Sequence, residues 1–292
     1  MTNETLTDDR LPTRFDGGPR FRIRPNRFGR EGIRAVREAW RFMRADAVFV
    51  SYPKSGRTWV RAMISRVYQR RYGLPDGLLL EFDDFHRRNA EIPRILFTHD
   101  GDASRKPEEF GHDRTRYASK KTVFLARNPL DVVVSRYYHA RFRGHHFSYG
   151  HELDDFVWKP NGGLASIVSF LNAWHQARQS IDRFLLLRYE DFHARPVETL
   201  GRLMSFLGLE ASEDELCEAV AFTAFEQLKE KEASGYYKSS RLRPRDPGNP
   251  DSFKVRSGKV GGYLESFPPD MIRRMEDFVR SNLTDAYGYL RA

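Results

Sequence analysis

The sequence predicts an α/β protein of three layers, α/β/α, in which helices cover both faces of a central parallel sheet. Short runs rich in β-branched and aromatic residues alternate along the chain with helical patterns, which is typical of such a sheet. One strand-to-helix junction also carries a Pro-Lys-Ser-Gly-Arg-Thr turn, a composition suited to phosphate binding. These observations predict a P-loop-like nucleotide-binding fold. The expected strands cover 47–52, 94–99, 121–126 and 183–189.

Helices are expected between and after these strands. Apolar residues recur at helical spacing over 31–45 and again after residue 58. Asn128 can cap the helix that follows the third strand, and Pro129 suits its first turn. A loop is expected after the fourth strand. The remaining expected helices cover 196–208, 212–232 and 269–283.

Composition narrows the class of protein. The chain has 292 residues and one cysteine, Cys217, which excludes a disulfide scaffold. No apolar run approaches the ~18 residues of a membrane span, and the N-terminus lacks a signal-peptide pattern. We therefore expect a soluble, cytoplasmic protein. Residues 1–30 are expected to form a flexible arginine-rich arm, and residues 31–292 a single domain.

The net charge of +9 raises the question of an anionic partner. Residues 1–46 hold eleven arginines against seven acidic residues, so they account for +4 of it. The remaining +5 is spread over 246 residues, which is a weak indication of nucleic-acid binding. We expect no nucleic-acid partner, and the positions of individual cations become the informative feature.

The turn between the first strand and its helix is the most informative segment. Lys54 supplies a full charge, Ser55 and Thr58 supply hydroxyls, and Gly56 permits close approach of the backbone. A helix N-terminus adds free N–H groups and a favourable dipole for an anion. The segment is not a Walker A motif, because G-x-x-x-x-G-K-[ST] is absent. On residue types alone, an ordinary strand-to-helix turn remains an alternative.

Four segments in order resemble those of sulfotransferases that use 3′-phosphoadenosine 5′-phosphosulfate (PAPS). They are YPKSGRTW at 52–59, RNPLDVVVSRYYH at 127–139, LRYED at 187–191 and FKVRSGKVGGY at 253–263. The chain is similar to a bacterial-like member with a cytosolic-type domain. The resemblance implies transfer of the sulfuryl group of PAPS to an acceptor hydroxyl. The donor then leaves as adenosine 3′,5′-bisphosphate (PAP), and no metal is required.

Such a donor carries phosphates at two positions, so the resemblance implies two anion sites. The turn with Lys54 corresponds to the 5′ site, and Arg127 with Ser135 to the 3′ site. Arg127 precedes a helix, where a cation opposes the helix dipole. An anionic partner therefore accounts for it better than the alternative of an exposed arginine at a helix start. Trp59 resembles the residue that stacks on adenine, although a core role is an alternative. The implied donor-binding residues are Lys54, Ser55, Gly56, Arg57, Thr58, Trp59, Arg127, Ser135, Tyr189, Thr223, Phe225, Arg256, Ser257 and Gly258.

The resemblance also implies the catalytic groups. His99 lies at the end of the second expected strand, where the family has its general base, and a neutral imidazole suits that task near pH 7. Lys54 is expected to stabilise the departing phosphate oxygen.

Three positions depart from the family pattern. One of them is Ala224, which replaces a Ser between Thr223 and Phe225. Arg57 replaces a common Thr, and Phe97 stands where the cytosolic animal members have Lys.

The acceptor is left open by the sequence. A small-molecule, lipid or glycan hydroxyl fits, and N-sulfation and the oligomeric state are undecided. Two other functions remain as alternatives: a P-loop-type nucleoside or metabolite kinase, and a non-catalytic polyanion-binding protein. His145, His146 and His151 form a loose cluster whose spacing matches no known metal site, so no metal is expected.

Overall fold

A computed structural model describes residues 27–101, 104–111, 113–143 and 152–289. The chain divides into two units, 1–40 and 41–292, and each is described by itself. Helix α1 (Arg27–Arg44) begins four residues before the helix expected at 31, and its last turn belongs to the larger unit. Residues 1–26 of the arginine-rich arm expected over 1–30 lie outside the described residues. A domain boundary at residue 30 stays a prediction.

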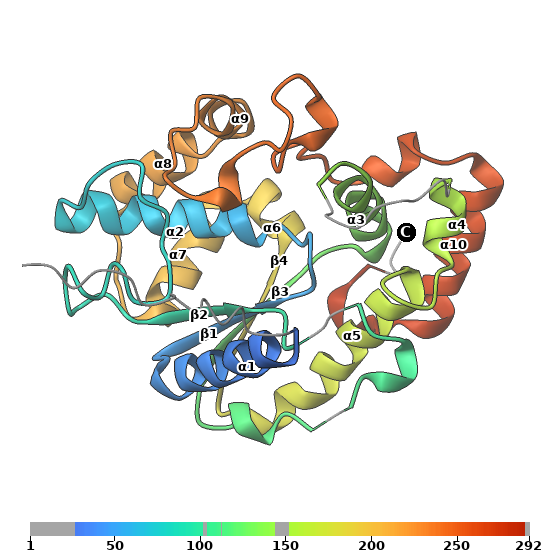
Figure 1. Ribbon diagram of the computed structural model, residues 1–292, viewed down its shortest axis with the longest axis horizontal. Helices are drawn as coiled ribbons and strands as arrows, with labels where there is room; N and C mark the ends of the chain where they lie inside the picture. Colours follow the sequence, from blue (N-terminus) through green and yellow to red (C-terminus); the bar gives the residue numbers. More distant parts are fainter. Residues whose placement is uncertain (1–26, 102–103, 112, 144–151, 290–292) are drawn as a thin grey trace, which may run out of the picture. The chain divides into compact units, whose positions relative to one another are not determined.

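The larger unit is built on a parallel sheet of four strands in the order β2-β1-β3-β4 (Figure 1). β1 pairs in parallel with both β2 and β3, and β3 with β4. The four predicted strands are confirmed within one or two residues at each end. They are β1 (Ala47–Ser51), β2 (Ile95–Thr98), β3 (Lys121–Ala126) and β4 (Arg183–Arg188).

Helices cover both faces of this sheet, as predicted (Figure 1). Alternate side chains of a strand point to opposite faces. Phe49 and Val123 pack with α2 (Arg57–Tyr72), α7 (Pro196–Leu207) and α8 (Glu213–Phe222). Val50 and Phe124 pack on the other face, in the core that α3 (Pro129–Arg143), α5 (Leu164–Ala177) and α10 (Pro269–Asn282) complete. The two cores give the three-layer α/β/α architecture.

Shorter elements connect these layers. Three further α-helices are α4 (Leu153–Val157), α6 (Tyr189–Ala194) and α9 (Phe225–Ala233). The 3₁₀ turns are η1 (Pro107–Glu109), η2 (Thr115–Tyr117), η3 (Arg178–Ser180), η4 (Ser240–Leu242), η5 (Pro250–Ser252), η6 (Gly262–Glu265) and η7 (Asp285–Tyr287). In the described part of the chain, no helix has the length and apolar character needed to cross a membrane.

Three local features test the sequence-based assignments. The side chain of Asn128 accepts a hydrogen bond from the amide of Leu130 at 2.9 Å, so the predicted cap of α3 is confirmed. The prediction of a loop after β4 is wrong, because α6 begins immediately after the strand with Tyr189. The helix expected over 212–232 is two helices, since Thr223 ends α8 and Ala224 precedes α9 in an extended conformation.

Phe124 lies at the centre of one core, and its removal should destabilise the fold. Its ring stacks on Trp174 at 5.3 Å and on Phe170 at 5.9 Å, and it is fully buried. We expect Phe124→Ala to lower the free energy of unfolding by about 3–5 kcal/mol, because it leaves a cavity in a packed core. Urea denaturation measures this. Leu264→Ala, at a side chain 55% exposed, is the control and should change the value by less than about 0.5 kcal/mol.

Candidate active site

A cavity of about 420 Å³ opens where the strands end. Each of the four strands is followed by a residue that lines it: Pro53 after β1, His99 after β2, Arg127 after β3 and Tyr189 after β4. This is the expected position for a ligand site in a parallel α/β sheet. The predicted site residues that line the cavity are Lys54, Gly56, Arg57, Thr58, Trp59, His99, Arg127, Ser135, Tyr189, Thr223, Phe225, Arg256, Ser257 and Gly258.

The turn between β1 and α2 forms one wall. Lys54 and Gly56 both have left-handed backbone conformations, with φ of 75° and 91°. Glycine is required at the second of these, because a Cβ there would lie 2.4 Å from the Tyr189 ring. Among the described residues, no acceptor takes the amides of Lys54, Gly56, Arg57 or Thr58. Free amides at the start of a helix, beside an ammonium, make a cradle for an anion.

Ser55 is the predicted site residue that does not line the cavity. Its side chain is buried behind the turn, and its hydroxyl has no hydrogen-bond partner among the described residues. Its amide donates to the carbonyl of Tyr52 at 3.3 Å, which closes the turn. The contacts of Ser55 are therefore those of a residue that shapes the cradle.

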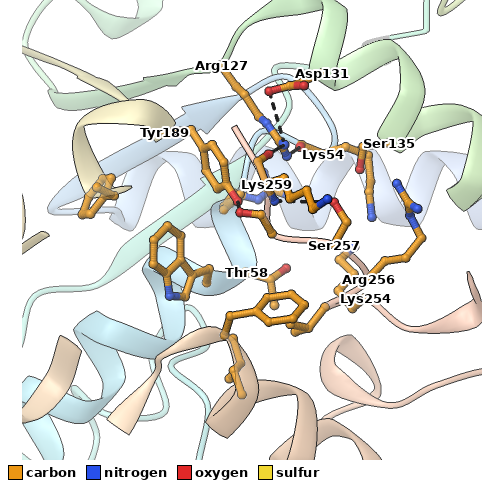
Figure 2. A pocket seen from close by; sticks show the side chains of 18 of the residues that line it. Lys54, Thr58, Arg127, Asp131, Ser135, Tyr189, Lys254, Arg256, Ser257 and Lys259 are labelled. Carbon is orange, nitrogen blue, oxygen red and sulfur yellow. Dashed lines mark hydrogen bonds and ion pairs between the residues drawn. The ribbon is translucent and has the colours of Figure 1, made fainter. Parts of the chain in front are cut away.

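Arg127 is buried in the wall of the site, where Figure 2 shows it beside Asp131 and Tyr189. Its guanidinium donates to the carbonyl oxygens of Lys54 and Lys259, at 3.2 and 3.0 Å, and lies 4.0 Å above the Tyr189 ring. Its only described carboxylate partner, Asp131, is 3.8 Å away. Nε has no partner among the described residues. A buried cation held by carbonyls and an aromatic face retains unmet capacity for an anion.

A second group of polar side chains gathers close to Arg127. Figure 2 shows Ser135, Arg256 and Ser257 on the same side of the cavity as Lys54 and Arg127. The guanidinium of Arg256 lies 3.8 Å above the Tyr138 ring, and its nearest described carboxylate, on Asp251, is 3.8 Å away. The sequence therefore identified residues that the fold brings together from α3 and from a segment more than 110 residues later.

The late segment is anchored by a buried carboxylate. Asp131, in the first turn of α3, accepts hydrogen bonds from the amides of Gly261 at 2.9 Å and Tyr263 at 3.2 Å. Asp131 therefore ties the late segment to the start of α3. Gly258 packs against Phe225 so closely that a Cβ would lie 2.4 Å from that ring.

Aromatic side chains line the opposite part of the cavity. Trp59 packs edge-on against Tyr189, with ring centroids 5.6 Å apart, and against His193 at 4.8 Å. Its indole N–H donates to the carbonyl of Thr223 at 2.9 Å. The hydroxyl of Thr223 donates within its own helix, to Ala219 at 2.7 Å. Trp59 is thus both packed and exposed to the cavity, so the two readings left by the sequence are compatible.

His99 is held by hydrogen bonds at both ring nitrogens. Nδ1 lies 2.6 Å from the carbonyl of Ser51, an acceptor, so Nδ1 carries the proton. Nε2 lies 2.7 Å from the guanidinium of Arg57, which can only donate, so Nε2 accepts. Arg57 also donates to the carbonyl of Thr98 at 2.6 Å. His99 is therefore a neutral imidazole whose basic nitrogen faces Arg57.

Burial and neighbouring cations shift the ionisation of this site. Burial lowers the pKa of His99 well below its usual value, and Arg57 lowers it further. Burial also lowers the pKa of Lys54 well below its usual range. The positive charges of Lys254, Arg143, Arg127 and Arg256 lower it further. The pKa of Arg57 falls to about 9 for the same first reason. Without a ligand, positive charge in the cavity is incompletely neutralised.

Two cavity residues were missed by the sequence analysis. His139 lines the cavity, and burial with nearby Lys54 lowers its pKa to about 3. Its spacing held an indication, because Asp131, Ser135 and His139 recur at every fourth position and so share one face of α3. Lys254 belongs to the segment 253–263 that carries the resemblance, was given no role there, and lines the cavity with Lys54. The cluster of His145, His146 and His151 lies outside the described residues.

Comparison with known proteins identifies the family. A model of the sulfotransferase domain matches residues 44–286, which is most of the chain. The chain therefore belongs to the sulfotransferase domain family, and it is a sulfotransferase enzyme. Cytosolic sulfotransferase 16 of Arabidopsis thaliana is 26% identical over 275 residues, covering 87% of this chain and 81% of that protein.

Solved structures share the fold. Mouse sulfotransferase SULT7A1 complexed with PAP aligns with a TM-score of 0.58 and 20% identity, over 84% of this chain and 87% of that one. Retinol dehydratase in complex with androsterone and inactive cofactor PAP aligns with a TM-score of 0.54 and 20% identity, over 82% and 81% of the two chains. The predicted α/β, P-loop-like fold is thereby confirmed.

The hydrogen bonds of His99 predict its titration. We expect a neutral, Nδ1-protonated imidazole whose pKa lies below 6.5, because burial and the Arg57 charge disfavour the imidazolium. Arg57→Met removes one of these causes and should raise the pKa of His99. Nitrogen-15 NMR of the histidine rings measures both tautomer and pKa. Arg70→Met, on the exposed end of the same helix, is the matched control. An unshifted His99 in Arg57→Met contradicts the assignment.

Proposed function

We propose that this sulfotransferase uses PAPS as donor and transfers its sulfuryl group to an acceptor hydroxyl, releasing PAP. The supporting observation is a single cavity with two separate groups of residues suited to binding anions. The free amides of the β1–α2 turn stand beside Lys54, and Arg127 stands with Ser135, Arg256 and Ser257. PAPS carries phosphates at both the 5′ and 3′ positions, so one molecule can occupy both. The PAP complexes of the two structural relatives agree with this donor.

In the proposed reaction, His99 accepts the proton of the acceptor hydroxyl at Nε2. The acceptor oxygen bonds to sulfur as the bond from sulfur to the bridging phosphate oxygen breaks. That oxygen takes the electron pair and leaves with PAP, stabilised by the ammonium of Lys54. Arg57 must leave Nε2 before the proton can arrive there, because both need the same lone pair. Donor or acceptor oxygens are the natural new partners for this guanidinium.

The acceptor class remains broader than a single compound. Androsterone and retinol are named in complexes of retinol dehydratase, which supports a small hydroxyl-bearing molecule. A lipid or glycan hydroxyl is also compatible with this proposal. That the chain is a bacterial-like member and is cytoplasmic stays a prediction.

A kinase is the less favoured alternative. Metabolite kinases need an acidic side chain free to hold the Mg²⁺ of ATP. Asp131 is the carboxylate nearest to Arg127 in the described chain, and its oxygens already accept the amides of Gly261 and Tyr263. A terminal sulfuryl carries less charge than a terminal phosphoryl and requires no such ion.

Ligand-induced stabilisation distinguishes the candidates. We expect PAP to raise the melting temperature, because the two anion sites of the cavity match the two phosphates of PAP. ATP–Mg²⁺ should have a much smaller effect at equal concentration. Differential scanning fluorimetry measures both. A preference for ATP–Mg²⁺ would overturn the sulfotransfer proposal in favour of the kinase. Loss of PAP binding on deletion of residues 1–30 would favour a polyanion-binding protein.

His99→Ala tests the general base. We expect sulfuryl transfer to fall by about 10²–10⁴-fold, while the dissociation constant for PAP changes little. Transfer of labelled sulfate from PAPS is measured onto pooled phenols, sterols, glycans and lipids, and then onto the acceptor so found. His175→Ala, on α5 and absent from the cavity lining, is the matched control. Transfer at a comparable rate in His99→Ala would remove His99 from its proposed role.

A further inference from the structure

The proposed donor and its product differ by one group, the sulfuryl. Lys54 is assigned above to the phosphate oxygen that departs with the product, and no residue has been assigned to the three outer oxygens of the sulfuryl group. The inference that follows rests on the proposed function and concerns those oxygens. The residue in question is Lys254, which lies between η5 and η6 and lines the same cavity as Lys54 and His99.

A buried carboxylate fixes the backbone of Lys254. Glu232, at the end of α9, is fully buried. Its two oxygens accept the amides of Lys254 and Val255, at 2.7 and 2.8 Å, and Arg143 lies 3.5 Å from one of them. The carboxylate therefore holds the chain at this point. Its contacts are with backbone amides and Arg143, so it holds Lys254 in place through the main chain.

The ammonium of Lys254 has no hydrogen bond or ion pair of its own within the described residues. The contacts of this residue with Glu232 are made by its amide. A lysine that lines a cavity without a carboxylate partner is uncommon, because its desolvation is not compensated. Such a residue is poised for an anionic ligand.

Three titratable groups of the cavity lie within electrostatic reach of Lys254. Among neighbouring charges, it makes the largest contribution to lowering the pKa of Lys54. It also lowers the pKa of His99 and of His139. All three line the cavity that Lys254 also lines, so its charge acts on groups of the proposed transfer site.

The charges around Lys254 leave it in need of an anion. Arg143 of α3, Arg57 of α2 and Arg241 of η4 all disfavour its charge, and the acid that opposes them is Glu232. Burial is the largest cause, and the pKa of Lys254 falls to about 8. A sulfuryl group, with its charge spread over three oxygens, supplies the missing negative charge without a metal.

We propose that Lys254 is a further catalytic residue, whose ammonium contacts the outer sulfuryl oxygens of PAPS and stays with them during transfer. Lys54 then serves the bridging oxygen that gains the electron pair, and Lys254 the group that moves. Phe97 stands at the position where cytosolic animal sulfotransferases carry a lysine, so this chain has no cation there to share the role. The Phe97 ring is covered by the guanidinium of Arg61 at 3.9 Å, which is itself paired with Glu81.

A binding experiment without any acceptor tests this role. Isothermal titration calorimetry gives dissociation constants for PAPS and for PAP with the full chain and with Lys254→Met. A charge-assisted hydrogen bond to the sulfuryl predicts that the substitution weakens PAPS binding by about tenfold to a hundredfold. PAP lacks the group, so its binding should weaken by far less. Lys254→Arg should keep most of the preference for PAPS.

The control is Lys121→Met, which removes the same charge at the amino end of β3, the opposite end of the sheet from the cavity. It should leave both constants unchanged. Equal weakening of PAPS and PAP in Lys254→Met, with an unchanged melting temperature, overturns the proposal, as does no effect on either ligand. A wild-type chain that binds neither PAPS nor PAP overturns the proposed function itself, which separates the two failures.

Discussion

The contact between the Tyr189 ring and Gly56 is the one on which the site depends. Tyr189 follows β4 and Gly56 follows β1, and the missing Cβ of the glycine lets the ring lie against the turn. The same ring carries the guanidinium of Arg127 on its face, and its hydroxyl donates to the carbonyl of Gly258 at 3.2 Å. One aromatic side chain thus ties together the anion cradle, the buried arginine and the late segment.

Buried positive charge is the second organising feature. Lys54, Arg57, Arg127 and Lys254 lie in one cavity. Burial is the largest cause of the lowered pKa values of Lys54, Arg57 and Lys254. Such a site is electrostatically unfavourable when empty and is relieved by an anion. Two buried carboxylates, Asp131 and Glu232, do not neutralise these groups fully because their oxygens hold backbone amides. The two carboxylates that position the late segment thus leave the cations of the cavity available to a multiply charged donor.

The sequence was most informative where local chemistry decides the structure. The four strands, the turn after β1 and the capped start of α3 follow from short-range rules, so they were predictable from the sequence. Helix α5 was not, since nine of its fourteen residues are buried and its apolar residues surround it instead of forming a stripe. The hydrogen bond between Arg57 and His99 joins residues 42 apart in the chain. Lys254 lines the same cavity as Lys54, although it follows Lys54 by 200 residues. No local pattern encodes such pairings, and only the residue types could be anticipated.

The anchoring of the late segment by Asp131 bears on the order of folding. The carboxylate of Asp131 and the amides it holds are separated by 130 and 132 residues, and closing so long a loop is slow compared with forming the adjacent strands and helices. During synthesis the sheet can assemble as soon as β4 has emerged, with the cradle and Arg127 already in place. The segment that carries Lys254, Arg256 and Ser257 joins only after residue 263 has left the ribosome. Because α10 follows this segment in the chain, the core that α10 completes is also unfinished while the cavity is open. Nucleotide bound as the cavity closes would favour these last steps of folding.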